Sequence, residues 1–261
     1  MSFIKYNINQ YMNWNASKES RLTTSLQSSK CSDKLVGGVD EAGRGSVIGP
    51  LVIAGVSIKA ENISSLQEAG VRDSKLLTLK GRQRLLSQIL DLAEHICLFK
   101  SDCREVDQYV FSNTLNKLEA EAMAVVIDNI YAQKVYVDAC DINPIRYRQC
   151  IECKLTSVLK PKIFSLHHAD RINTVVSAAS IIAKVIRDQE IQKLRSRYNE
   201  LGSGYPCDHK TMKFITDWII KYNSAPSFAR KSWKPLKVIL KHDDDDDGTS
   251  IKLSARNGDY M

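Results

Sequence analysis

Residues 39–50 read Val39-Asp40-Glu41-Ala42-Gly43-Arg44-Gly45-Ser46-Val47-Ile48-Gly49-Pro50, and they follow an apolar, β-rich run that begins at Leu35. Two carboxylates at the end of a buried strand are costly unless they are paired, protonated or bound to a cation. The glycines of the turn that follows let backbone amides approach a ligand closely, and its arginine can meet a phosphate. The stretch therefore predicts a strand that leads into a site for a cation and an anionic ligand.

Two other interpretations of this stretch are a dinucleotide-binding loop and a tight hairpin with solvated acids. The glycines loosely match G-x-G-x-x-G, but the last one is a residue late. Pro50 and a β-rich run then follow, where a helix would have to hold the pyrophosphate. The hairpin accounts for the glycines but not for two acids next to apolar Val39. We therefore favour the cation site.

Strand and helix patterns alternate along the rest of the chain. After the strand at 35–39, further strands are predicted at 51–58, 95–100, 134–137 and 162–166. Helical periodicity predicts helices at 78–94, 113–130, 144–159, 174–197, 208–222 and 233–241. This order is typical of the α/β class, with a central mixed sheet flanked by helices and a helical C-terminal part.

Composition divides the chain into three predicted parts. Residues 1–33 are polar and read as a flexible N-terminal extension, residues 34–241 form the folded body, and residues 242–261 form an acidic flexible tail. The helical C-terminal part of the body begins at about residue 200. The chain has 37 basic and 30 acidic residues, a net charge of +7; residues 243–261 carry −4, so the remainder carries +11. A body this basic suits a nucleic acid or an anionic membrane surface.

Several classes of protein are disfavoured. No apolar run is long enough for a transmembrane helix, and the N-terminus lacks the apolar segment of a secretory signal. We therefore expect a cytoplasmic protein, or a nuclear one if the source is eukaryotic. Seven scattered cysteines argue against a secreted disulfide framework. Cys150 and Cys153 form a lone C-x-x-C with no second ligand pair nearby, so we interpret them as buried or idle thiols.

Two more carboxylates follow predicted strands. Asp138 closes the strand at 134–137, and Asp170 lies between the next strand and the longest helix, where it could also be a helix cap. Together with Asp40 and Glu41 they would form an oxygen-only cage of the kind that holds Mg²⁺ or Mn²⁺. Two such ions about 4 Å apart serve in phosphodiester cleavage. The basic body and the acidic pocket together predict a metal-dependent nuclease.

The chain resembles the ribonuclease HII family, the type 2 ribonucleases H. The resemblance covers nearly the whole body. It rests on segments that occur in the family's order: Asp40-Glu41-Ala42-Gly43-Arg44-Gly45, Asp73-Ser74-Lys75, Tyr136-Val137-Asp138-Ala139, His168-Ala169-Asp170, Val175 to Lys184, and Gly202-Ser203-Gly204-Tyr205-Pro206. It implies the ribonuclease H-like fold.

The resemblance also assigns roles to residues. The four metal-binding acids are those at positions 40, 41, 138 and 170. The residues that read the 2′-hydroxyl at an RNA–DNA junction are Gly43, Arg44, Gly45 and Tyr205. A 2′-hydroxyl is what distinguishes RNA from DNA at one nucleotide, and close backbone approach by glycines can hydrogen-bond it. Without the resemblance, Tyr205 would read as a turn residue that covers the core. Lys75 is either a phosphate contact or a solvated lysine.

The activity that the resemblance implies is an endonuclease. It would cleave the RNA strand of RNA–DNA hybrids and cut 5′ of ribonucleotides embedded in duplex DNA, leaving 3′-hydroxyl and 5′-phosphate ends. Hydrolysis would use two Mg²⁺ or Mn²⁺ ions and no protein nucleophile. His167 and His168 are then structural. The expected partners are these nucleic acids and no membrane. Whether the chain works alone, with accessory subunits or with a sliding clamp stays open, and the tail carries no clear clamp-binding motif.

Two alternatives belong to other classes. A non-catalytic subunit that binds hybrids would also be basic, but it has no reason to keep four mutually repulsive acids. A two-metal phosphatase acts on a small substrate and needs no extended basic surface. The sequence also departs from the family's pattern, with Ser46 in place of a usual proline and with Ile172-Asn173-Thr174 where an aromatic residue and proline are common. Neither departure removes an acid.

Overall fold

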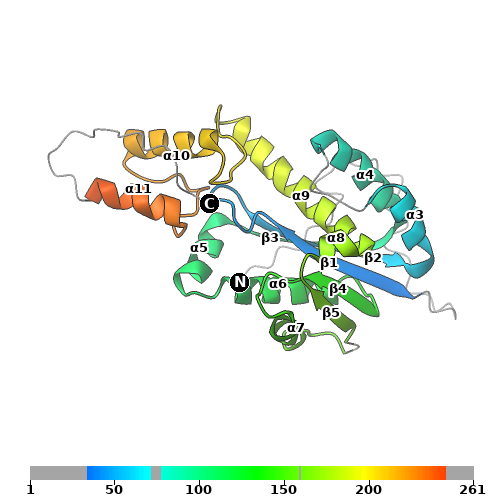
Figure 1. Cartoon of the computed structure of the whole chain (residues 1–261). Coiled ribbons are helices and arrows are strands. Elements are labelled where there is room, and N and C mark those ends of the chain that lie inside the picture. The colour runs from blue at the N-terminus through cyan, green and yellow to red at the C-terminus, as the bar shows by residue number, and fades with distance from the viewer. Residues whose placement is uncertain (1–33, 72–77, 159, 245–261) are drawn as a thin grey trace.

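The computed structural model describes residues 34–71, 78–158 and 160–244. Its centre is a five-stranded sheet in the order β3-β2-β1-β4-β5 (Figure 1). The strands are β1 (Leu35–Ala42), β2 (Leu51–Lys59), β3 (Ala93–Ser101), β4 (Lys134–Asp138) and β5 (Lys162–Leu166). The first three strands are antiparallel, whereas β4 and β5 run parallel to β1. The predicted mixed sheet and its class are confirmed.

Helices cover both faces of the sheet (Figure 1). On one face lie α3 (Ile63–Glu68), α4 (Leu79–Leu92), α8 (Ala169–Ile172) and the long α9 (Thr174–Arg195); on the other lie α6 (Leu115–Asp128) and α7 (Pro144–Glu152). Each face has its own apolar core, because successive strand residues point to opposite sides. Val39 of β1 therefore packs toward α6, and Ala42 packs with the α9 side.

A third apolar core joins the C-terminal part to the turn after β1. It contains Val47 and Ile48 of that turn together with residues of α10 (His209–Tyr222) and α11 (Lys234–Asp244). Ile48 also forms an isolated β-bridge with Ala229, between these two helices. The helical C-terminal part is thus packed directly on the glycine-rich turn that follows β1. None of the described helices is both long enough and apolar enough to cross a membrane.

Five helical elements differ from prediction. The 3-10 helix η2 (Ala60–Asn62) and the helices α3, α5 (Cys103–Phe111) and α8 were not predicted, and α7 ends at Glu152 instead of 159. The chain turns after α7 because Asp128 of α6 accepts hydrogen bonds from the amide of Thr156 at 2.8 Å and from its hydroxyl at 2.6 Å. The predicted extension 1–33 and residues 245–261 of the predicted tail lie outside the described residues.

Candidate active site

The acids Asp40 and Glu41 lie on opposite faces of β1. Asp40 is buried on the α9 side, where its carboxylate hydrogen-bonds the side chain of Ser180, and its Oδ1 accepts the Glu41 amide at 2.8 Å. Glu41 belongs to the α6 side, where the charge of Glu119 acts on it. Its Oε2 is buried without a hydrogen-bond partner. Consecutive residues of one strand therefore bring carboxylates to both sides of the sheet edge.

The other two acids come from neighbouring segments. Val39 pairs with Val137 in the parallel ladder of β1 and β4, so Asp138 stands beside Asp40. The Asp138 Oδ1 accepts the amide of Ala169 at 2.7 Å, which fixes the start of α8. Asp170, the next residue of α8, is buried. Because β1 and β4 run side by side and α8 begins next to Asp138, the four acids lie around the same end of these two strands, where the charges of Asp138 and Asp170 act on Asp40.

The electrostatics of the site are dominated by burial and by repulsion between acids, which the charge of Arg44 offsets only in part at Glu41. Burial, followed by the charges of Asp138 and Asp170, raises the pKa of Asp40 to about 7, although its bond to Ser180 works against this. Burial and the charges of Asp40, Glu119 and Asp138 raise the pKa of Glu41 well above its ordinary value. A bound cation would relieve this repulsion, and all-oxygen donors suit a hard divalent ion.

The four acids suit a divalent metal ion in the type of their donor atoms and in their negative charge. Among residues 34–71, 78–158 and 160–244, no three His, Cys, Asp or Glu side chains are grouped closely enough to hold an ion as they stand. Asp40 and Asp138 each bind a backbone amide instead. A cation would offset the cost of burying the Glu41 Oε2, because a buried carboxylate oxygen without a hydrogen-bond partner is costly.

The G-R-G turn is tightly constrained around Arg44. Gly43 has a φ of +85°, and a Cβ there would lie 2.5 Å from the carbonyl oxygen of Pro50, so only glycine fits. Gly45 is exposed and faces open space. The Arg44 guanidinium forms an ion pair with Glu119 and donates to the Asn116 side chain at 2.9 Å. Its guanidinium is therefore held by α6, while the backbone at Gly45 stays accessible.

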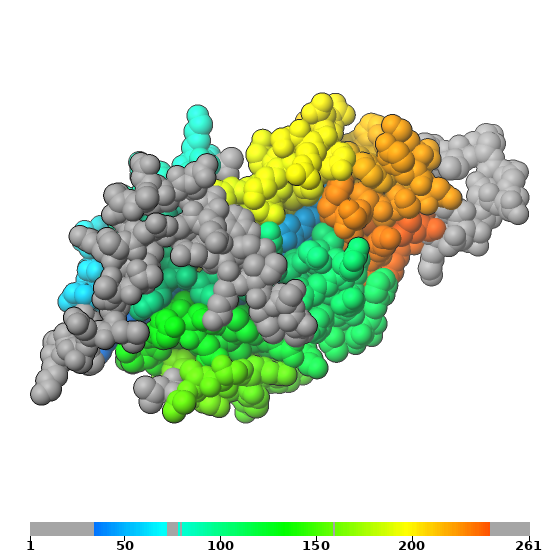
Figure 2. Space-filling model, turned by 180° about the vertical axis from the view of Figure 1, so that it is seen from behind, coloured from blue at the N-terminus to red at the C-terminus, as the bar shows by residue number. Residues whose placement is uncertain are grey.

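The structure brings Tyr205 to the same turn. The carbonyl of Gly204 accepts the amides of Val47 at 2.8 Å and Ile48 at 3.1 Å. The Arg187 guanidinium lies over the Tyr205 ring, 4.4 Å from its centroid. In Figure 2 a patch of blue, the first part of the described chain, surfaces between the yellow end of α9 and the green middle part of the chain. Segments about 160 residues apart thus share one surface.

Two buried charged residues in this site were missed by sequence reasoning. Glu119 is fully buried and pairs with Arg44; a signal existed, because position 119 falls four residues after Leu115 on the predicted inner stripe of its helix. Arg230 is also fully buried and donates to the carbonyl oxygens of Arg44 at 2.7 Å and Gly49 at 3.0 Å. Nothing in its local sequence marks Arg230.

The remaining candidates lie elsewhere. Lys75 is outside the described residues. The His167 ring nitrogen Nε2 donates to the carbonyl of Ile142 at 3.2 Å, which fits a structural role. Cys150 and Cys153 are free thiols and are exposed, so the interpretation of them as buried is wrong.

Known proteins resemble this chain over the part that forms the site. The family model described as Ribonuclease HII matches residues 37–236. The chain belongs to the ribonuclease HII family. Ribonuclease HII of Pyrococcus furiosus is 42% identical over 206 residues, which cover 78% of this chain and 90% of that protein. Ribonuclease HII of Cenarchaeum symbiosum is 43% identical over 205 residues, covering 78% and 98%.

Solved structures agree with this assignment. The crystal structure of ribonuclease H2 from Pyrococcus horikoshii OT3 matches with a TM-score of 0.76 and 39% identity over 81% of this chain and 100% of that one. Ribonuclease HII in the PCNA complex from Archaeoglobus fulgidus matches with a TM-score of 0.70 and 34% identity over 78% and 96%. As a member of this family, the chain has the ribonuclease H-like fold and is an endonuclease that acts on RNA–DNA hybrids. The catalytic interpretation is favoured over the non-catalytic one.

Proposed function

We propose that this enzyme cuts on the 5′ side of ribonucleotides embedded in duplex DNA, in addition to the RNA strand of hybrids, and leaves 3′-hydroxyl and 5′-phosphate ends. One observation carries the proposal. The amides of Val47 and Ile48 donate hydrogen bonds to the Gly204 carbonyl, and these two bonds hold Tyr205 beside the G-R-G turn. That turn follows directly on the strand that carries Asp40 and Glu41.

To recognise a single ribonucleotide, the protein needs groups that hydrogen-bond the 2′-hydroxyl of that nucleotide. The backbone of Gly43, Arg44 and Gly45 supplies amides and carbonyls, and the Tyr205 hydroxyl supplies a further donor and acceptor. Arg187 supports the ring of Tyr205 by stacking on it. Arg230 supports the turn through the Arg44 carbonyl. Lys75 remains a predicted phosphate contact.

The acids Asp40, Glu41, Asp138 and Asp170 are the proposed holders of two divalent ions, Mg²⁺ or Mn²⁺. Such ions, when bound, supply a polarised water and stabilise the charge that develops on the scissile phosphate. The protein's own part is to orient the carboxylates. Ser180 holds the carboxylate of Asp40, and the Ala169 amide holds that of Asp138.

Two further proposals concern the setting of the enzyme. A sliding clamp is a proposed partner, supported by the PCNA complex of the Archaeoglobus fulgidus relative. A pull-down with PCNA tests it, and absence of retention would contradict it.

The proposed location is the cytoplasm, or the nucleus in a eukaryotic cell; imaging of the tagged protein tests this.

The cleavage experiment uses a labelled DNA duplex with one ribonucleotide, a continuous RNA–DNA hybrid and an all-DNA control, each with and without Mg²⁺ or Mn²⁺. We expect metal-dependent cutting just 5′ of the single ribonucleotide and no cutting of the control. Cutting of the continuous hybrid alone would leave the endonuclease activity intact and overturn the junction proposal. A Tyr205→Phe variant separates the hydroxyl from the ring, because it keeps the stacking surface that Arg187 contacts.

A further inference from the structure

A groove of about 480 Å³ lies between the α5–α6 junction and the start of α11. The polar side chains of Asn113, Asn116, Ser232 and Lys234 line it together with apolar side chains that include Leu115 and Trp233. In Figure 2 the orange-red of α11 lies near green residues from the middle of the chain on the face where the blue patch surfaces. None of the described residues that line it is acidic.

The groove lies next to residues that hold the G-R-G turn. Asn116, in its wall, accepts the hydrogen bond from the Arg44 guanidinium at 2.9 Å. Trp233, in its floor, lies under the guanidinium of Arg230 with 4.9 Å between the guanidinium carbon and the ring centroid. Arg230 in turn donates to the Arg44 carbonyl. Both sides of Arg44 therefore connect to the groove.

The groove is also held rigidly. Buried Asp107 of α5 accepts the amides of Lys231 and Ser232, each at 2.9 Å, and the hydroxyl of Ser232. These bonds fix the segment that enters α11 onto α5. A site of this kind costs little ordering on binding, because its backbone is already in place.

The charge beside the groove is positive. Lys231, Lys234 and Lys237 are exposed at a spacing of three residues, and none of them forms an ion pair with another described residue. Lys237 lies over the exposed ring of Phe111, with 5.2 Å between its Nζ and the ring centroid, which makes a cation–π contact. Amides, an indole and unpaired lysines together suit a sugar–phosphate backbone.

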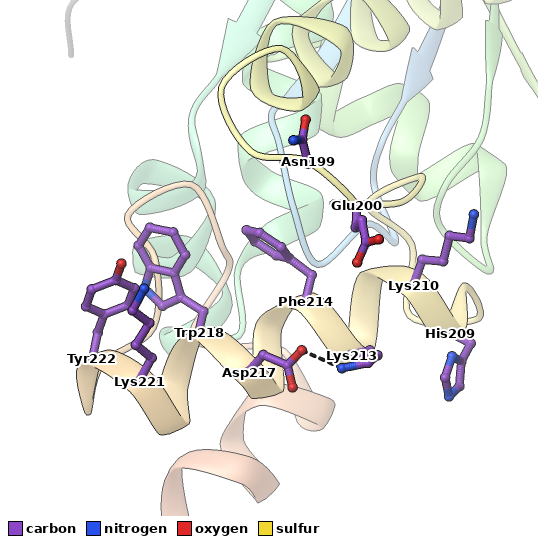
Figure 3. A pocket seen from close by; sticks show the side chains of 10 residues that line it. All are labelled: Asn199, Glu200, His209, Lys210, Lys213, Phe214, Asp217, Trp218, Lys221 and Tyr222. Atoms are coloured by element: carbon purple, nitrogen blue, oxygen red, sulfur yellow. Dashed lines mark hydrogen bonds and ion pairs between the residues drawn. The ribbon is translucent and has the colours of Figure 1, made fainter.

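The hollow beside α10 offers a contrast (Figure 3). It is of similar size, about 500 Å³, and contains Lys210, Lys213 and Lys221. Its lining also includes Glu200 and Asp217, and Asp217 pairs with Lys213 at 2.6 Å. Because these acids offset part of the positive charge, a polyanion gains less there than in the groove beside α11.

We propose that the groove beside α11 binds the phosphodiester backbone of one strand of the substrate duplex, next to the nucleotide that the G-R-G turn contacts. This rests on the proposed function, because it takes the turn to be the point of contact with the ribonucleotide. Lys231 and Lys234 are the residues that neutralise phosphates, and the polar groups of the groove set the path of the strand.

The test compares two double variants of the full chain. Lys231→Ala with Lys234→Ala removes two charges at the groove. The control, Lys134→Ala with Lys162→Ala, removes two exposed lysines that pair in register at the opposite end of the parallel strands. Binding to a non-cleavable all-DNA duplex and to the single-ribonucleotide duplex is measured by fluorescence anisotropy at several salt concentrations, and KM is measured for cleavage.

We expect the groove variant to bind both duplexes about 10-fold more weakly. The slope of log affinity against log salt concentration should become shallower by up to about two, one for each phosphate contact that is removed. KM for cleavage should rise by a similar factor, whereas the control variant stays within about twofold of the wild type. Equal losses in both variants, or none in the groove variant, would overturn the proposal. Binding to all-DNA does not depend on cleavage, so failure of the junction activity would be recognised separately.

Discussion

The two faces of β1 meet their helices in different ways. On the α9 side, a Cβ at Gly38 would lie 2.3 Å from backbone atoms of Val175, so the helix backbone rests directly on the strand. On the α6 side, a Cβ at Gly37 would meet only side-chain atoms, the nearest 2.9 Å away on Ile130. A face built by backbone contact cannot adjust, whereas side chains can move. The rigid face carries Asp40, and the adaptable face carries Glu41.

The largest expected effect is on cleavage, through the two acids of β1 that lie on opposite faces of the sheet. Asp40→Asn and Glu41→Gln should each reduce cleavage of an RNA–DNA hybrid on the order of 10³-fold or more, because each removes a charge from one proposed metal site. Hybrid binding should be retained. Single-turnover cleavage measures the loss. Near wild-type turnover in either variant would mean that the two faces do not serve one centre.

The next effect tests the packing contrast itself. Gly38→Ala should lower the free energy of unfolding by about 3 kcal/mol or more, since the α9 backbone has to move, whereas Gly37→Ala should cost about 1 kcal/mol. Urea denaturation of the two variants measures both. Equal costs would remove the distinction between a rigid and an adaptable face.

A smaller effect is expected at the buried ion pair of the α6 side. Glu119→Gln should lower the free energy of unfolding by about 1–3 kcal/mol, because Arg44 loses its charged partner in a buried setting but keeps partial access to solvent. Glu121→Gln is a matched control on the same helix, where the more exposed pair with Lys154 contributes less than about 1 kcal/mol. A similar cost at both positions would show that Glu119 does not position the turn.

The smallest effect is a pH dependence of stability without metal. Burial raises the pKa of Asp40 to about 7, so the folded state keeps a proton that the unfolded state releases near 3.8. The stability linked to this proton is present below pH 4 and is lost as the pH rises through 7. Asp40→Asn should therefore raise Tm relative to wild type more at pH 8 than at pH 5, by about 2–4 °C for each kcal/mol.

Added Mg²⁺ provides the control for that prediction. It should stabilise the wild type at pH 8 more than the Asp40→Asn variant, because the ion binds the charged carboxylates of the folded state. Thermal melts with and without the ion measure this. The same Mg²⁺ response in both proteins would contradict a metal site at Asp40.

Much of the fold was predictable because local patterns agree with it. The strand at 162–166 and the start of the long helix at Thr174 were predicted at their observed positions, and the strand that ends at Asp138 was predicted to within one residue. Helix α5 was missed although a local signal existed. The Asp102 side chain accepts the Glu105 amide at 2.8 Å, the contact that an acid followed three residues later by Glu predicts.

The sequence by itself determined which acids end the strands and which glycines shape the turn, because strand periodicity and turn chemistry are local. Only the tertiary structure decided that Asp40 and Glu41 face different helices, that Glu119 holds Arg44 across 75 positions, and that Arg230 reaches the same turn across 186. A buried charge is tolerated only with its partner beside it, and such partners meet only when the chain has folded.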